Sequence, residues 1–153
     1  RDTTEINSSE NIKVLEENNV DTNTIRKIQH QKKVQQENEK LQIALHYTRN
    51  QFALYVSGED LDWLCNAVIG YSNKEDIPDL RLIITRELSN LDLYHFGWNI
   101  WNHFRVTNQD TIANFLKTVF DSLKDVEQES IKAHLRDDEQ RGIIKIQKNL
   151  SNK

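Results

Sequence analysis

The residues best placed to do chemistry lie in an aromatic-rich segment, Asp92 to Phe104. His95, Asn99 and His103 recur there every four residues, so in a helix they share one side. Their imidazole nitrogens could bind a metal ion or carry protons. However, two histidines eight residues apart are separated by about 12 Å along a helix, too far to share one ion. We expect no metal site and no cofactor, and predict that the histidines form hydrogen bonds at a helix interface.

A second candidate set consists of the carboxylates Glu59, Asp60 and Asp62. Paired carboxylates can act as general acid and base, but acidic residues in the first turn of a helix also stabilise its dipole. The sequence has no glycine-rich phosphate loop, G-x-S-x-G elbow or Cys–His zinc spacing. The single Cys65 falls on an apolar helical face, where a packed core thiol is expected. These patterns favour a protein that is not an enzyme.

The elements that must position these residues are helices. Among 153 residues there are one proline and four glycines, too few for the turns of a β-sandwich or barrel. We predict an all-α (mostly α) fold: a multi-helix bundle of about six helices, with one long N-terminal helix and at most one short C-terminal strand. Because Arg1 comes first and methionine is absent, we expect a piece of a longer protein.

The N-terminal third is expected to hold a flexible extension and then a long helix. Residues 1–20 are polar and aperiodic, with at most a short helix that ends at Asn18–Asn19. Asp21 then caps a helix that joins the bundle over residues 21–56. A heptad pattern runs through Val34, Asn38, Leu41, Leu45, Thr48, Phe52 and Tyr55. A second apolar face at Ile43, Ala44 and Tyr47 favours burial among several helices over a two-stranded coiled coil.

Residues 57–141 are predicted to form the helical core domain. Capping patterns start helices at Ser57 and at Thr107, and Pro78 is expected to start another. Helical spacing there predicts inward-facing residues: Leu80, Ile83, Ile84, Leu88 and Leu91. After a last helix over about 127–139, Gly142 begins a C-terminal tail or short strand over residues 142–153.

Charge and hydropathy limit the partners. The net charge is −4, and residues 51–104 hold eight acidic and only three basic side chains. Nucleic-acid binding requires a clustered positive surface. The one basic run, Arg26–Lys27 with Lys32–Lys33, is best explained as a solvated helix face. No apolar run reaches about 18 residues, so we expect no membrane segment and a cytoplasmic location.

The segment 107–136 resembles helix-turn-helix DNA-binding domains. The similarity rests on Asn108 to Leu116, which includes Ala113, and on Ser130 to Arg136 downstream. The resemblance implies that Ser130, Lys132, Ala133 and Arg136 face DNA. The spacer between the two parts is longer than the usual turn, and a plain helical pair explains the same residues.

The leading hypothesis is a noncatalytic helical module that binds a protein partner or itself. The aromatic helix carries more apolar surface than one buried face requires, and tryptophan is a strong interface anchor. We therefore expect partner-binding residues at Trp98, Trp101, Tyr94 and His95, with an exposed Trp98 or Trp101 as the anchor. No small-molecule substrate is evident from the sequence, and DNA binding through residues 107–136 is the alternative.

Overall fold

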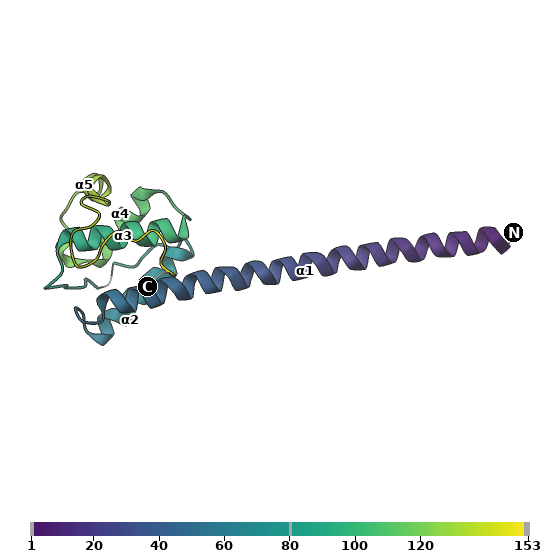
Figure 1. Cartoon of the computed structure of the whole chain (residues 1–153), viewed down its shortest axis with the longest axis horizontal. Coiled ribbons are helices and arrows are strands. Elements are labelled where there is room, and N and C mark those ends of the chain that lie inside the picture. Colours follow the sequence, from purple (N-terminus) through teal and green to yellow (C-terminus); the bar gives the residue numbers. More distant parts are fainter. Residues whose placement is uncertain (1, 80, 152–153) are drawn as a thin grey trace. The chain divides into compact units, whose positions relative to one another are not determined.

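The computed structural model describes residues 2–79 and 81–151, with side chains described from residue 21 onward. The elements, in chain order, are α1 (Asp2–Phe52), α2 (Gly58–Ser72), α3 (Asn90–Phe104), α4 (Gln109–Val119), the 3₁₀ helix η1 (Asp121–Leu123) and α5 (Gln128–His134) (Figure 1). The described residues form no strand beyond one isolated β-bridge. The predicted mostly α fold is confirmed, with five α-helices instead of about six.

The chain forms two compact units, Arg1–Glu39 and Lys40–Lys153, hereafter unit 1 and unit 2. Unit 1 consists of the greater part of α1, whose backbone continues through Asn18 and Asn19 without the predicted break. Every described side chain of unit 1, from residue 21 to residue 39, is exposed. The flexibility of residues 1–20 stays a prediction.

Unit 2 is organised around α3. Phe96 of this helix stacks edge-on against Phe52 at the end of α1, with ring centroids 4.8 Å apart, and against Phe120 at 6.2 Å. Phe52 and Phe120 also stack on each other at 5.7 Å. Their side chains are fully buried. Aromatic pairs of this geometry stabilise a core beyond their buried area, so this cluster joins α1 to the centre of the unit.

Glycine allows the close approach of α3 and α4. A Cβ atom added at Gly97 would lie 2.4 Å from Cδ1 of Leu116, a separation that real Cβ atoms do not show. Leu116 is itself fully buried on the amphipathic face of α4. The α3–α4 contact is therefore close because position 97 has no side chain.

The helix predicted after Pro78 is wrong. The described residues between α2 and α3, 73–79 and 81–89, form no helix, and Ile83 forms a parallel β-bridge with Phe120. Ile83 N–H donates to the carbonyl of Val119 at 2.8 Å, and Asp121 N–H donates to the carbonyl of Ile83 at 3.0 Å. Ile83, Ile84 and Thr85 are three consecutive β-branched residues, which favour an extended chain.

Burial in this segment follows the extended backbone. Ile83 and Leu88 are buried as expected, whereas Ile84 is 55% exposed because neighbouring side chains in an extended chain point to opposite sides. Leu91 is half-buried, and Leu80 lies outside the described residues. The helical spacing on which the prediction rested was therefore coincidental.

Several helix ends also differ from the predicted ones. Ser57 caps α2 as expected, its hydroxyl accepting from the Asp60 N–H at 3.1 Å. α4 is capped by Asn108 and not by Thr107, whose hydroxyl is hydrogen-bonded to that of Tyr71 at 2.7 Å. α1 ends at Phe52 and α5 at His134, both earlier than predicted.

Candidate functional site

The central polar feature of unit 2 is a row of side chains on the otherwise apolar α3. Asp92, His95, Asn99 and Asn102 are spaced three or four residues apart and therefore lie on one face of the helix. We call these four residues the polar stripe. Residues 142–150, which follow α5, run along it as an irregular segment that we call the strap. Each stripe residue makes at least one hydrogen bond to the strap main chain.

Asp92 fastens the beginning of the strap and the start of α3 together. Its Oδ1 accepts from the backbone N–H groups of Ile143 at 2.7 Å and Ile144 at 2.9 Å. Its Oδ2 accepts from the backbone N–H of Ser89 at 2.8 Å, completing a capping box with the Ser89 hydroxyl. A buried carboxylate is stabilised when it accepts several N–H hydrogen bonds, and this one accepts three.

His95 joins the strap to the turn after α5. Its Nδ1 lies 2.8 Å from the carbonyl oxygen of Ile144, and its Nε2 lies 2.5 Å from that of Asp137. The ring is completely buried. Both carbonyls accept only, so an imidazolium ring satisfies both of them and a neutral ring satisfies one. The hydrogen bonds predicted for this histidine are present, but they reach backbone groups of the strap and of the turn after α5, not another helix as predicted.

Asn99 and Asn102 hold the middle of the strap. Nδ2 of Asn99 donates to the carbonyl of Lys145 at 2.9 Å, and its Oδ1 accepts from the N–H of Gln147 at 2.7 Å. The Asn99 amide also donates to the Tyr47 hydroxyl of α1 at 2.7 Å, while Asn102 donates to the carbonyl of Lys148 at 3.1 Å. Asn99 thus offers the strap one donor and one acceptor, as a neighbouring strand would.

Apolar side chains and one glycine complete the docking of the strap. Ile144, Ile146 and Leu150 are buried, whereas Ile143 is half exposed. Gly142 has φ +90°, and a Cβ added there would lie 2.5 Å from Oδ1 of Asp92. Glycine is required at this position both by the backbone angle and by the nearby carboxylate. Residues 142–150 of the predicted C-terminal tail therefore form a segment bound to α3.

The predicted partner-binding residues of α3 are less exposed than expected. Trp98 is 4% exposed, and the Arg136 guanidinium lies over its ring, 4.8 Å from the centroid. Trp98 is therefore not the exposed anchor, because the core and the Arg136 side chain cover it. Trp101 is half-buried; its Nε1 donates to the carbonyl of Thr107 at 2.9 Å, and Arg105 covers its ring at 4.0 Å.

Tyr94 and His95, the other two predicted partner residues, also have contacts within unit 2. The Tyr94 ring stacks on that of His134 with centroids 6.5 Å apart, and burial together with the charge of Asp137 raises the pKa of the Tyr94 hydroxyl. The described side chains of α3 thus meet the residues at the end of α5. The two predicted sets, for protein and for DNA, lie next to each other.

The predicted DNA-contacting residues do not form a free basic face. The Lys132 ammonium lies 3.2 Å from the Asp110 carboxylate, and Arg136 pairs with Glu139 at 3.1 Å. Ser130 is half-buried and Ala133 is exposed. The second helix of the pair has only seven residues. Each of the two cations is locally compensated by an acid, which weakens the attraction for phosphate.

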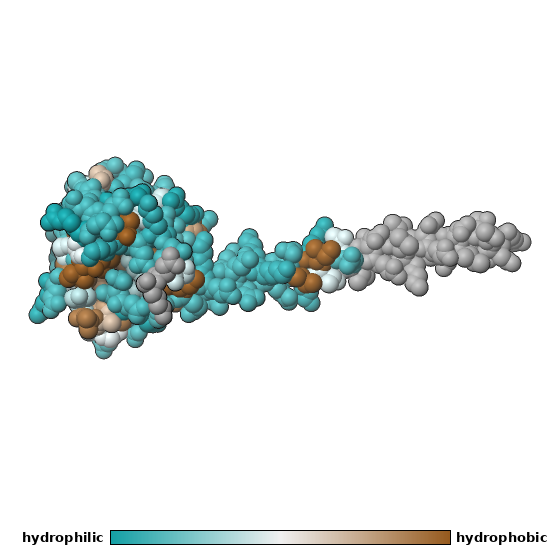
Figure 2. Space-filling view, viewed as in Figure 1, coloured by the Kyte–Doolittle hydropathy of each residue, from teal (hydrophilic) through white to brown (hydrophobic). Residues whose placement is uncertain are grey.

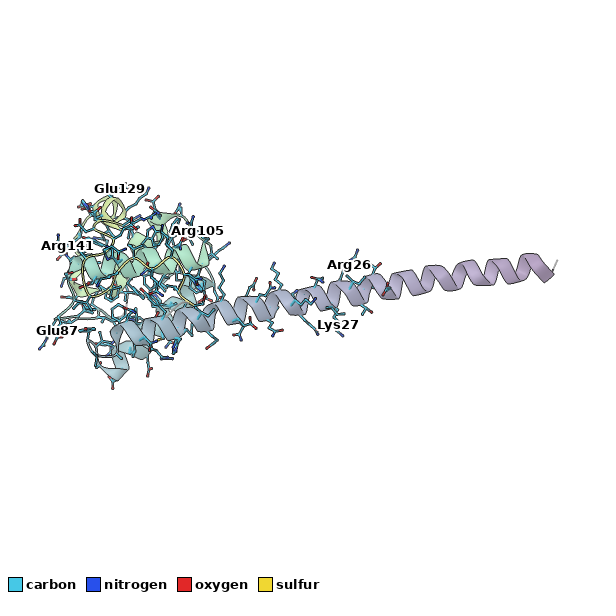
Figure 3. The ribbon with its side chains drawn as sticks, viewed as in Figure 1. Arg26, Lys27, Glu87, Arg105, Glu129 and Arg141 are labelled. Atoms are coloured by element: carbon cyan, nitrogen blue, oxygen red, sulfur yellow. The ribbon has the colours of Figure 1, made fainter. Side chains whose placement is uncertain are left out.

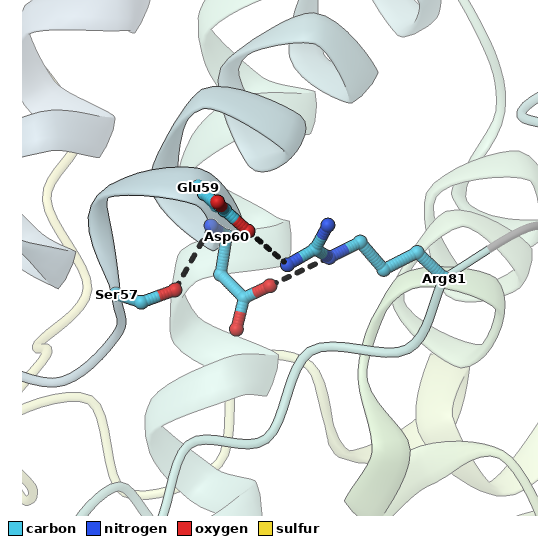
Figure 4. Close-up of polar contacts among 4 residues, drawn as sticks. All are labelled: Ser57, Glu59, Asp60 and Arg81. Carbon is cyan, nitrogen blue, oxygen red and sulfur yellow. Dashed lines mark hydrogen bonds and ion pairs between the residues drawn. The ribbon is translucent and has the colours of Figure 1, made fainter.

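The carboxylates at the start of α2 hold the extended segment that precedes α3. Arg81 donates from Nε to Asp60 at 2.7 Å and approaches Glu59 at 3.5 Å (Figure 4). These hydrogen bonds raise the pKa of the Arg81 guanidinium. Asp62 lies 4.0 Å from Arg49. The geometry gives these acids a structural use and no shared proton site.

His103, which was predicted to share one side of the helix with His95 and Asn99, lies beside α1. Its Nε2 is 2.7 Å from the carbonyl of Lys40, and partial burial lowers the pKa of its imidazole. Cys65 is buried as predicted, and burial raises the pKa of its thiol. Within the described part of the chain, no three metal-ligating side chains come together.

A pocket of about 520 Å³ opens between the last turns of α1 and the strap. Its lining includes four amide side chains, the titratable residues His46 and Tyr47, and the apolar residues Ile43 and Leu150. None of the predicted site residues lines this pocket. Its walls supply hydrogen bonds to neutral polar groups.

Comparison with known protein families, curated proteins and solved structures finds no match to this chain. Among the described residues, no helix is both long enough and apolar enough to cross a membrane.

Sequence reasoning found part of this site. It placed His95 and Asn99 on one helical face near Asp92, but it missed Asn102 and the strap as the binding partner. The available signal was a polar row at spacings of three and four residues within an aromatic helix, together with alternating apolar residues at Ile144 and Ile146 after Gly142.

Proposed function

We propose that this chain is a noncatalytic helical protein-interaction module, acting by self-association or by capture of a protein partner. One observation carries the proposal: residues 21–39 of α1 are helical, yet all of their side chains are exposed. Ile25, Ile28 and Val34 are 52%, 43% and 51% exposed. Figure 2 shows an apolar patch among hydrophilic atoms on this part of α1.

The physical argument is that a helix without packing is marginal in water. Isolated helices gain little from propensity alone, and most helical stability in proteins comes from burial of an apolar face. Arg26 and Lys27 extend from α1 as solvated side chains (Figure 3). A partner helix that covers Ile25 and Ile28 would supply the missing burial and leave these cations in water.

Self-association is tested by the mass of the whole chain in solution. We expect species of at least twice 18.1 kDa at micromolar concentration. The Ile25→Gln/Ile28→Gln chain keeps helix propensity and charge but removes four half-exposed isoleucines from a dimer. At about 1 kcal/mol each, this should weaken the dimer by about a thousandfold.

The matched control is the Gln29→Ala/Gln36→Ala chain, which changes two exposed polar residues of the same segment. It should self-associate like the wild type. A wild-type chain that stays monomeric, while hydrogen exchange shows residues 21–39 to be stably helical on their own, would argue against this interface. A monomer with an unprotected segment would direct the search to a different protein partner.

Trp101 is a second candidate contact of the module. It is half-buried and covered by Arg105, which is exposed and could move aside for a partner. Tyr94 is also half-buried, whereas Trp98 and His95 have buried side chains. A Trp101→Ala variant with unchanged self-association would remove Trp101 from the interface.

DNA binding through residues 107–136 remains the alternative proposal. It predicts salt-sensitive binding of duplex DNA that is lost when Lys132 and Arg136 are changed to glutamate. Fluorescence anisotropy with random-sequence duplex, titrated from low to physiological salt, tests it. We rank DNA binding second because Lys132 and Arg136 are paired with Asp110 and Glu139. A cytoplasmic location is likewise proposed, on the buried unpaired Cys65 thiol.

A further inference from the structure

We propose that the strap exchanges between two copies of the chain, so that the polar stripe of each copy binds residues 142–150 of the other. This contact lies wholly within unit 2 and does not depend on the exposed segment of α1. Exchange of an identical element is a low-cost route to a dimer, because the contacts of the monomer are reused.

The first argument is how the strap is held. The stripe recognises main-chain groups in sequence: the N–H groups of Ile143 and Ile144, then the carbonyl groups of Ile144, Lys145 and Lys148 and the N–H of Gln147. All of these donors and acceptors on the α3 side belong to side chains. A strap from a second copy presents the same groups and the same buried isoleucines, so the closed and exchanged forms have equivalent contacts.

The second argument is that a pivot can be located at one residue. On one side of it, Asp137 is held by its own α3, because its carbonyl oxygen faces Nε2 of His95. On the other side, Glu139 belongs with the strap, because its carbonyl accepts from the N–H of Ile146 at 3.0 Å. Asp138 lies between these two attachments. Rotation at Asp138 can therefore release the strap without breaking either backbone attachment. The exposed ion pair between Arg136 and Glu139, which spans the pivot, must open in the process.

The third argument is that the pivot is strained in the closed form. Asp138 has φ +48°, a left-handed conformation that aspartate adopts more readily than most residues but at a higher cost than glycine. It is held there by a turn in which Arg141 N–H donates to its carbonyl at 2.8 Å. Asp138, Arg141 and Gly142 are all exposed, so nothing covers the pivot. Strained short hinges favour exchange, since the open form releases the strain.

Exchange is tested by refolding an equal mixture of ¹⁵N-labelled and ¹³C-labelled full chains from urea at high concentration. The chains carry Ile25→Gln and Ile28→Gln, so that association through α1 does not contribute. We expect a dimer fraction that persists after dilution. In it, isotope-filtered spectra should show contacts between the Asn99 side-chain amide of one label and strap protons near Lys145 of the other.

Substitutions at Asp138 test whether the backbone conformation of the pivot controls the yield of exchanged dimer. Asp138→Gly accepts the left-handed angle at little cost and should lower the dimer yield at least about fivefold, because the closed form is relieved. Asp138→Val, whose branched side chain opposes that angle, should raise the yield. Asp125→Gly, at an exposed turn residue outside the hinge, should leave it unchanged.

Three results would overturn the exchange: recovery of monomer alone, a dimer whose strap contacts are all within one label, or equal dimer yields from the wild-type pivot and both Asp138 variants. None of these results bears on association through Ile25 and Ile28. Conversely, a monomeric wild type under native conditions with an exchanged dimer after refolding would reject self-association through α1 and support exchange.

Discussion

Replacing Asn99 by alanine should selectively loosen the strap and destabilise unit 2. The side chain is completely buried and makes three hydrogen bonds, to the Tyr47 hydroxyl, the Lys145 carbonyl and the Gln147 N–H. At about 1 kcal/mol net for each bond, their loss costs about 3 kcal/mol. Partner groups left buried without hydrogen bonds raise the cost towards about 5 kcal/mol.

That magnitude is a large part of the stability of a domain, which is typically about 5–15 kcal/mol. Urea unfolding followed by tryptophan fluorescence measures it. The matched control is Asn66→Ala, at an exposed position of α2, because both changes gain the same helix propensity and only one removes buried hydrogen bonds. The difference between the two variants should be at least about 3 kcal/mol.

Hydrogen exchange separates local from global loosening. In Asn99→Ala, the Gln147 N–H loses its own acceptor, so the informative amide is that of Ile144, whose acceptor Asp92 is unchanged. It should exchange faster by more than the amides of the α4 core do, because the strap opens first. If the two alanine variants differ by less than about 1 kcal/mol and the Ile144 amide keeps its protection, the polar stripe does not fasten the strap and the reasoning fails.

Three further predictions concern packing, titration and reactivity. Gly97→Ala should lower the free energy of unfolding by about 1–3 kcal/mol, because the new Cβ would meet Leu116. The control Gly58→Ala, whose Cβ meets nothing within 4 Å, should be neutral or stabilising in the same urea assay. Stabilisation by both substitutions would refute the close packing at Gly97. Since burial lowers the pKa of His103, the folded state binds fewer protons than the unfolded state below about pH 6.5. The free energy of unfolding should therefore fall as pH falls, and it should fall less in His103→Gln. Equal pH slopes in the wild type and the variant would contradict this. The buried Cys65 thiol, with its raised pKa, should react with a thiol reagent far more slowly in the native chain than in urea, and equal rates would show that it is accessible.

Composition and periodicity predicted the helical class and most helices, because amphipathic spacing reports burial directly. The amphipathic pattern of α4 and the placement of Cys65 in the core are of this kind. The segment after Pro78 failed because its apolar residues satisfy helical spacing while its β-branched run and its bridge to Phe120 impose an extended chain. The local spacing of apolar residues does not reveal a β-bridge to a residue that lies 37 positions away in the sequence.

Only part of the polar stripe was predicted from the sequence: His95 and Asn99 share one helical face near Asp92, but the strap was not predicted as their partner. Asn99 and Lys145 are 46 residues apart, and the strap offers main-chain groups that every residue possesses. The sequence therefore does not show which segment will supply the main-chain groups that bind the polar stripe. The alternation at Ile144 and Ile146 suggested a strand. In the structure the main chain of this segment is hydrogen-bonded to side chains of α3, where a strand would be hydrogen-bonded to the backbone of a neighbouring strand.

The polar stripe also affects how the protein is made. During synthesis, residues 90–104 leave the ribosome well before the strap, and for that interval the face of α3 that will be covered is open to water. An apolar face would attract other nascent chains during this delay. Asp92, His95, Asn99 and Asn102 can instead be hydrated until residues 142–148 arrive, at which point their hydrogen bonds are transferred from water to the strap. The face of α3 that is covered last is thereby the one least able to cause aggregation.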